Sequence, residues 1–292
     1  MRGPKVVSIG ELLFDVFPDG ERLGGAPSNF AYHTATLGGN AHLISAVGDD
    51  GRGSEALRRL GAAGVNVDGV RSVSEKQTGV VSVALDESGQ PTYDIIEDVA
   101  WDQIEISPSI ETIVRDARAI CWGTLGQRSC RSQSAHRQLF DFVPDDCLRV
   151  CDINVRQQYH SIEVVTESLN HADLLKLNDE EVPVLRSYIG GSNDSRAFVR
   201  ELRHRFNITT VVLTMGADGC RVFANDVDFK EPGVPVDVVN TVGSGDAFTA
   251  AFVLQVLGGA DLKSCAQHSN RVGAYVATQD SGMPDLPDHF RQ

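Results

Sequence analysis

Short apolar runs rich in β-branched residues alternate along the chain with longer segments whose apolar residues recur at helical spacing. This alternation is typical of a mostly parallel sheet with helices on both faces. The runs that predict strands are Val6 to Ile9, Ala41 to Val47, Ala119 to Trp122, Arg149 to Ile153, Asp173 to Leu177, Thr210 to Thr214 and Val234 to Val239. Helices are predicted from Ser54 to Leu60, Ser132 to Phe142, Arg196 to Phe206 and Ala247 to Leu257. Pro27 in a first turn and Gly38-Gly39 after Leu37 bracket one more helix.

Residues 71–98 depart from this alternation. Two strand-like runs, Thr78 to Leu85 and Thr92 to Ile96, flank a turn-like stretch at residues 86–91, which predicts an inserted β-hairpin. Paired with the strand-like Leu12 to Phe17, the hairpin would form a small sheet that acts as a lid. The alternative is a peripheral hairpin that extends an edge, and periodicity does not separate the two. We expect one domain over residues 1–292, with a lid formed by roughly 11–18 and 71–98.

Composition and charge narrow the class of partner. The 292 residues are 41% hydrophobic, and 26 Lys and Arg against 40 Asp and Glu give a formal net charge of -14. Such a chain would repel nucleic-acid phosphates and anionic membrane surfaces, so we expect a small-molecule partner, no nucleic acid and no membrane. The first 14 residues, interrupted by Glu11, are too short for a signal peptide or membrane helix. The six cysteines form no CxxC pair, which favours reduced thiols in a cytoplasmic protein.

The strongest chemical signal is a predicted strand that runs through the glycine turn Gly243-Ser244-Gly245 into an apolar helix. Glycines there allow successive amides to point into one concavity at a positively polarised helix start, which binds phosphate oxygens. Asp246 follows in the first helical turn. A carboxylate repels phosphate, but it would hold a hydroxyl and aim its oxygen at phosphorus. The competing interpretation is a favourable helix-start residue, and the residues alone do not decide between them.

A second glycine-rich block extends from Gly24 to Ala31 and is followed by Leu37-Gly38-Gly39 and by Val47 to Gly53. This block and Asn240 to Asp246 resemble the two signatures of the ribokinase-like (pfkB) carbohydrate kinases. The resemblance covers nearly the whole chain. It implies a three-layer α/β/α fold with a mostly parallel central sheet and a small β-sheet lid. It also implies ATP and Mg²⁺ as cofactors, with Asp246 as catalytic base beside the amides of Gly243, Ser244 and Gly245.

Residue by residue, the resemblance assigns sugar contacts to Asp15, Gly24, Gly25, Asn29, Asn154 and Arg156, the last two within Asp152-Ile153-Asn154-Val155-Arg156. For ATP it assigns Asn178, Thr214, Gly216, Gly219, Gly243, Gly245 and Asn270, and for magnesium Glu181, mainly through water. Each assignment has a structural alternative. The glycines can serve loops or turns, Asp15 and Asn270 can be solvated, and Asn178 with Glu181 can form a capping-box-like pair.

Two features depart from familiar phosphate-binding patterns. Asn240 stands where the family usually has Asp in the environment of a monovalent cation, which puts a potassium requirement in doubt. The chain also has no G-x-x-x-x-G-K-[ST] motif and therefore no P-loop lysine.

The substrate is inferred from resemblance. Gly-Gly-Ala-Pro-Ser-Asn, with Gly123 to Arg128 and Ala100-Trp101, is similar to fructokinases, which implies D-fructose phosphorylated at its terminal hydroxyl. 2-Keto-3-deoxygluconate, ribose or a nucleoside are rival substrates. A catalytically silent sugar- or nucleotide-binding member is an alternative from another class. A dinucleotide-dependent oxidoreductase is disfavoured because no G-x-G-x-x-G follows the first strand. The edges of a lid sheet lead us to expect a homodimer through the lid.

Overall fold

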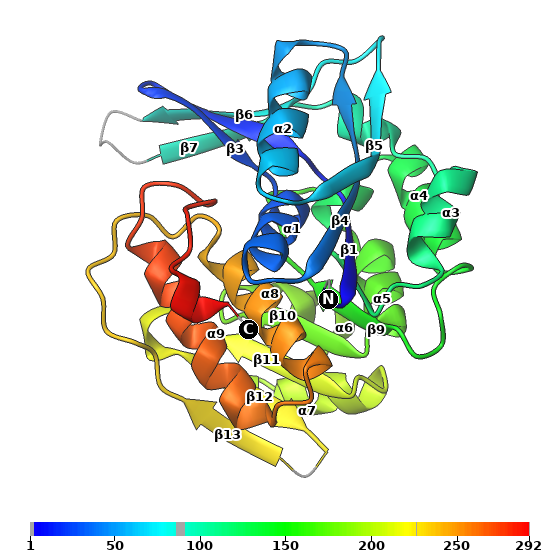
Figure 1. The fold of residues 1–292 in the computed structure, drawn as a ribbon. Helices are drawn as coiled ribbons and strands as arrows, with labels where there is room; N and C mark the ends of the chain where they lie inside the picture. The colour runs from blue at the N-terminus through cyan, green and yellow to red at the C-terminus, as the bar shows by residue number, and fades with distance from the viewer. Residues whose placement is uncertain (1–2, 86–90, 226, 292) are drawn as a thin grey trace.

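A computed structural model describes residues 3–85, 91–225 and 227–291, and its centre is a nine-stranded sheet (Figure 1). The strand order is β13-β12-β11-β10-β9-β8-β1-β4-β5, and all pairs from β11 to β5 are parallel. The strands are β1 (Lys5–Ile9), β4 (Asn40–Gly48), β5 (Asn66–Val73), β8 (Ala119–Trp122), β9 (Leu148–Asp152), β10 (Leu174–Asn178), β11 (Thr210–Thr214), β12 (Cys220–Ala224) and β13 (Val227–Glu231). The predicted mostly parallel sheet is confirmed.

Alternating side chains divide the core into two layers. Val6 packs with the α8 and α9 side, whereas Val7 packs with α3 to α7 on the opposite face, as the period of a strand requires. One face is covered by α1 (Ala26–Thr36), α2 (Gly51–Ala62), α8 (Ser244–Leu257) and α9 (Leu262–Ala277). The other is covered by α3 (Pro108–Val114), α4 (Cys130–Leu139), α5 (Ile162–His171), α6 (Glu181–Ile189) and α7 (Ser195–Arg205). The three-layer α/β/α prediction is therefore correct.

A separate four-stranded sheet projects at one end of the molecule (Figure 1). Its order is β3 (Gly20–Gly24), β2 (Leu13–Phe17), β6 (Gly79–Leu85) and β7 (Pro91–Ile95), with β2 and β6 parallel. The predicted hairpin corresponds to β6 and β7, and the turn predicted at residues 86–91 lies mostly outside the described residues. Residues 71–73, predicted to begin the lid insertion, belong to β5 in the large sheet.

One predicted strand is wrong. Residues 234–239 form no strand, and Val236, Val238 and Val239 are 38%, 59% and 64% exposed. Pro235 lacks the N–H that a ladder needs, so the valines alternate without pairing. In place of this strand, the sheet ends in the antiparallel strands β12 and β13, which the pattern did not predict.

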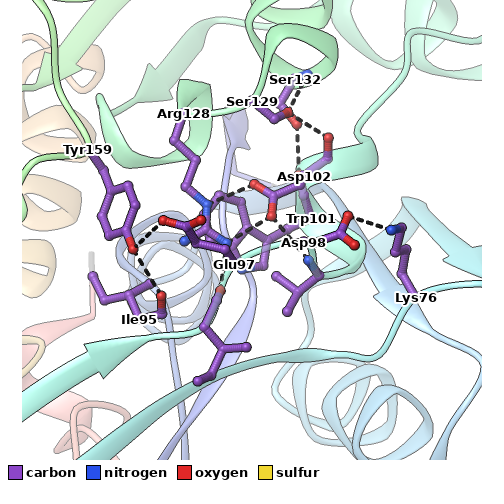
Figure 2. Close-up of polar contacts among 12 residues, drawn as sticks. Lys76, Ile95, Glu97, Asp98, Trp101, Asp102, Arg128, Ser129, Ser132 and Tyr159 are labelled. Atoms are coloured by element: carbon purple, nitrogen blue, oxygen red, sulfur yellow. Dashed lines mark hydrogen bonds and ion pairs between the residues drawn. The ribbon is translucent and has the colours of Figure 1, made fainter.

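A buried ion pair fastens the small sheet to the rest of the fold (Figure 2). Arg128 binds Asp102 through Nε and Nη2, both at 2.8 Å, and the two side chains are 5% and 6% exposed. The guanidinium lies over the Trp101 ring, 3.8 Å from its centroid, and donates to the Ile96 carbonyl (2.7 Å). Tyr159 donates to the Ile95 carbonyl (3.2 Å). Two carbonyls at the end of β7 are thus held by side chains from outside the small sheet.

Among the described residues, no helix has both the length and the apolar character that crossing a membrane requires.

Candidate active site

A cavity of about 990 Å³ lies at the carboxyl ends of β9, β10 and β11, bordered across from them by β2, β6 and β7 of the small sheet. This is the edge at which open parallel sheets form their sites. Most of the predicted site residues line it: Asp15, Gly25, Asn29, Asn154, Arg156, Asn178, Thr214, Gly216, Gly219, Gly243, Ser244, Gly245, Asp246 and Asn270. Gly24 and Glu181 are not part of the lining. Residues more than 200 positions apart therefore meet in one hollow.

The turn Gly243-Ser244-Gly245 has the backbone conformation that the predicted phosphate-binding concavity requires. We call this concavity the anion cradle. Gly243 precedes α8 with a left-handed φ of 76°, and a Cβ there would overlap the carbonyl oxygen of Gly282. No other residue type fits both conditions. The helix begins at Ser244, three residues earlier than predicted, so the amides of Gly245 and Asp246 fall in the first turn, where N–H groups have no intrahelical partner.

Ser244 differs from the expectation that its amide faces phosphate. Its N–H donates to the carbonyl of Thr241 (3.2 Å), and its hydroxyl donates to the carbonyl of Gly273 (2.8 Å). Ser244 therefore holds the turn against α9, and the amides left for an anion are those of its neighbours.

Asp246 faces the cavity from the first turn of α8 and is held by Asn29 of α1. The Asn29 side-chain amide donates to Oδ2 of Asp246 (2.8 Å), which leaves Oδ1 to accept from another group. Burial, followed by the charge of Asp152, raises the pKa of Asp246 to about 6, although Asn29, Lys176 and Arg156 oppose the shift. The carboxylate is thus oriented, largely ionised at neutral pH and a better base than an exposed aspartate.

A buried lysine that the sequence pattern did not predict as a site residue lies against Gly245. Lys176 on β10 is 6% exposed, lines the cavity and binds Asp152 Oδ1 (3.0 Å), whose other oxygen accepts from Thr249 (3.2 Å). Its Nζ lies 3.2 Å from where a Cβ at Gly245 would be. Burial would lower the pKa of Lys176, but nearby carboxylates, Asp152 first, raise it above the usual value and keep the ammonium charged. A lysine inside the apolar run Leu174-Leu175-Lys176-Leu177 was the signal that could have revealed it.

Acidic side chains concentrate where β2 meets the start of α1. Asp15 on β2 lines the cavity, and burial raises its pKa to about 6 against the opposing charges of Arg156 and Arg22. Gly24 packs against Asp15, because a Cβ there would lie 2.5 Å from Oδ2, so it supports a site residue. Gly25 has a φ of 100° and lies against the Glu11 carbonyl, where a Cβ would be 2.5 Å away. Glu11, fully buried in the same wall, is the second residue that the sequence analysis missed.

Asn154 and Arg156 follow β9 and line the cavity opposite these acids. Asn154 has a left-handed φ of 45°, a conformation that asparagine tolerates better than most residues. The exposed Arg156 places a positive charge whose effect reaches Glu11, Asp15 and Asp246.

The opposite end of the cavity is less polar. Thr214, Gly216 and Gly219 line it from the turn between β11 and β12, and a Cβ at Gly219 would overlap the Glu231 carbonyl. Asn270 of α9 lines it as well and donates to the carbonyl of Pro232 (3.0 Å), so it is not a solvated surface residue. Alternate residues of the extended segment, Val234, Val236 and Val238, complete an apolar wall.

Asn178 and Glu181 form the reciprocal pair that the capping interpretation describes. The Asn178 amide donates to Glu181 Oε2 (2.7 Å), and the Glu181 amide donates to Asn178 Oδ1 (2.8 Å). Glu181 Oε1 accepts from the Val155 amide (3.1 Å). Both carboxylate oxygens are thus engaged, and no three His, Cys, Asp or Glu side chains of residues 3–85, 91–225 and 227–291 group to hold a metal. Direct metal binding by Glu181 does not fit this arrangement, whereas binding through water stays a prediction.

Asn240 precedes the glycine turn and does not line the cavity. Its Oδ1 accepts from the Val242 amide (3.0 Å), and its Nδ2 donates to the carbonyl of Asp280 (3.3 Å). The side-chain amide therefore occupies a carbonyl oxygen that could otherwise coordinate a cation.

The chain is similar to known proteins over nearly its whole length. Residues 5–289 match the model of the pfkB family carbohydrate kinase. The chain is 29% identical to fructokinase-2 of Zea mays, with 97% of this chain and 91% of the relative covered. It is also similar to an uncharacterized sugar kinase of Pyrococcus horikoshii solved in complex with ATP, with a TM-score of 0.79, 26% identity and coverage of 95% and 94% of the two chains. The structure of a Vibrio cholerae fructokinase shares the fold, with a TM-score of 0.83 at 23% identity and coverage of 98% and 97%.

Proposed function

Because this chain belongs to the pfkB family of carbohydrate kinases, we propose that it transfers the γ-phosphoryl group of ATP to the terminal hydroxyl of D-fructose, giving fructose 6-phosphate. One observation carries the proposal. Asp246, oriented by Asn29 at 2.8 Å, stands at the start of α8 beside a glycine turn, in a cavity that holds both a polar and an apolar end. A base and an anion cradle side by side suit phosphoryl transfer to an alcohol.

In the proposed reaction, Oδ1 of Asp246 accepts the hydrogen bond of the sugar hydroxyl. The hydroxyl oxygen forms a bond to the γ-phosphorus while the bond from that phosphorus to the leaving oxygen of ADP breaks. The proton passes to Asp246, whose raised pKa suits it to receive one. The amides of Gly245 and Asp246 and the Lys176 ammonium stabilise charge on the transferring group. Magnesium, brought with ATP, would offset phosphate charge, with the Asn178–Glu181 pair acting on it only through water.

The two ends of the cavity suit different parts of the reactants. The end with Glu11, Asp15 and Asn29 is rich in hydrogen-bonding groups, as a polyol needs. The part lined by Val234, Val236 and Val238 offers apolar side chains, which suit the flat base of ATP. Fructose is favoured among sugars because the Zea mays relative is named a fructokinase and the Vibrio cholerae structure contains fructose.

We further propose that the small sheet acts as a lid over one kinase domain. Leu13, Phe17, Val81 and Ile95 of that sheet line the cavity, so its movement would change the access of water to the sugar. Its edge strands β3 and β7 are where a second copy would add in a homodimer.

The test is ADP release by the purified protein with MgATP and a panel of D-fructose, 2-keto-3-deoxygluconate, D-ribose and adenosine. We expect the highest kcat/KM with fructose. In ¹³C NMR spectra of the product, splitting by ³¹P should place the phosphate group on the terminal carbon. A higher kcat/KM with another member of the panel would replace fructose as the proposed substrate but would still support the kinase activity. Binding of sugar or ATP by calorimetry without any turnover would support the catalytically silent alternative instead.

A further inference from the structure

Glu11 is a buried acid in the cavity wall that the proposed phosphoryl transfer does not use. It is 2% exposed and lies just after β1, where Glu11, Leu13, Asp15 and Phe17 line the cavity at every second position. This alternation places the Glu11 side chain on the same surface as Asp15, a residue assigned to the sugar. The carboxyl group of Glu11 therefore lies among hydrogen-bonding groups of the cavity wall.

One carboxyl oxygen has a structural partner and the other does not. Oε1 accepts from the Ala26 amide (3.2 Å) in the first turn of α1, where the preceding Gly25 offers no side-chain cap. Oε2 is fully buried and has no hydrogen-bond partner among the described residues. Helix capping therefore accounts for Oε1 but gives Oε2 no role. The side-chain oxygen of Asn29, Oδ1, is buried and unpaired in the same part of the described structure.

Two unpaired acceptors in one cavity wall are costly unless a ligand donates to them, because buried oxygen atoms lose their hydration. Burial and, less strongly, the negative charge of Asp246 raise the pKa of Glu11 to about 7, while the backbone amides of Glu11 itself and of Ala26 and the charge of Arg156 oppose the shift. When the carboxyl group is ionised, Oε2 can only accept, so it needs a donor such as a sugar hydroxyl.

We propose that Glu11 is a specificity-determining residue that binds, through Oε2, a sugar hydroxyl other than the one that is phosphorylated. The inference rests on the proposed kinase function and extends it. Asp246 Oδ1 is reserved for the reacting hydroxyl, so Glu11 selects the substrate by a second hydroxyl, and Oε1 keeps the start of α1 in place.

The variant Glu11→Gln tests the roles of Oε1 and Oε2 separately. In the variant, the amide oxygen keeps the bond from Ala26, because an NH₂ group facing that N–H would be repelled, and the NH₂ group takes the position of Oε2. The cap survives while an acceptor becomes a donor. At about pH 8, where Glu11 is largely ionised, we expect the KM for D-fructose to rise roughly 10- to 100-fold, the range for a hydrogen bond to a charged group, with the KM for ATP changed less than about twofold. Glu111→Gln, which removes the same charge from a pair with Arg115 on the surface of α3, should leave both constants unchanged.

Four analogues identify the hydroxyl: 1-deoxy-D-fructose, 2,5-anhydro-D-mannitol, D-psicose and D-tagatose alter the groups at C1, C2, C3 and C4. The effect of Glu11→Gln should fall below about threefold for the analogue that lacks or inverts the hydroxyl bound by Glu11. An equal effect on all four, or an equal rise in the KM for ATP, would overturn the inference and leave capping as the only role. Wild-type turnover on fructose tests the kinase proposal separately. If the variant does not fold, a crystal of the wild type with fructose decides: Oε2 within about 3.2 Å of a hydroxyl supports the inference, and more than about 4 Å overturns it.

Discussion

Replacement of Asp246 by Asn tests the proposed role of Asp246 as base directly, because the variant keeps the shape of the site. In the wild type, Asn29 donates to Oδ2 of Asp246 (2.8 Å). In Asp246→Asn, the amide oxygen must take that bond, since two NH₂ groups do not pair. The new NH₂ group then points at the reacting hydroxyl, where Oδ1 had been. The hydroxyl loses its acceptor and faces a second donor.

We expect turnover to fall roughly 10²- to 10⁴-fold, the usual effect of removing a positioned base, which corresponds to about 3–5 kcal/mol in the activation barrier. Binding of sugar and ATP should change little, because the glycine turn, Lys176 and the start of α8 do not depend on the carboxylate. The assay is steady-state ADP release with saturating D-fructose, together with calorimetric binding of ATP. Asp116→Asn is the matched control, since it removes the same charge from an exposed side chain that pairs with Lys5.

Two outcomes would refute the reasoning. Turnover within about tenfold of the wild type would mean that Asp246 is not the base and serves only the start of α8. A loss of turnover that is matched by an equal loss of ATP affinity would mean that the carboxylate maintains the cradle and does not act on the hydroxyl.

Four further predictions follow from the same geometry. Because the pKa of Asp246 is raised to about 6 and the base must be ionised, kcat/KM should fall as the pH drops through about 6; a flat profile down to pH 5 would contradict this. Asn240→Asp removes the donor from the Asp280 carbonyl and restores a carboxylate, so activation by potassium should appear or increase when rates are compared in KCl and NaCl. Arg128→Met leaves Asp102 buried without its partner and should lower the free energy of unfolding in urea by about 3–5 kcal/mol, whereas Arg131→Met, at a side chain 49% exposed, should cost less than about 1 kcal/mol. Burial raises the pKa of Glu11 from 4.5 to about 7, so the wild type should lose up to about 3 kcal/mol of stability between pH 4.5 and pH 7; Glu11→Gln should lack this loss, and parallel pH curves for the two proteins would count against it.

Much of the fold was predictable because it depends on neighbours in sequence. The bounds of β8 and β11 match the prediction, since each is a short β-branched or aromatic run closed by a turn residue. The glycine turn before α8 was also predictable, because only glycine fits the left-handed backbone at Gly243. The run Val234 to Val239 shows the limit of such patterns: its alternation is that of a strand, but Pro235 and the lack of a pairing partner left it outside the sheet.

The chain by itself determined the order of its layers, the position of the cradle and the place of Asp246 at a helix start, because these follow from backbone preferences and from the period of apolar residues. Only the tertiary structure decided that Asn29 orients Asp246, that Lys176 lies against Gly245 and that Glu11 lines the same cavity. The reason is physical. Desolvation and charge pairing depend on which distant segments meet, and a lysine or glutamate in an apolar run acquires a role only when the fold brings its partner within reach.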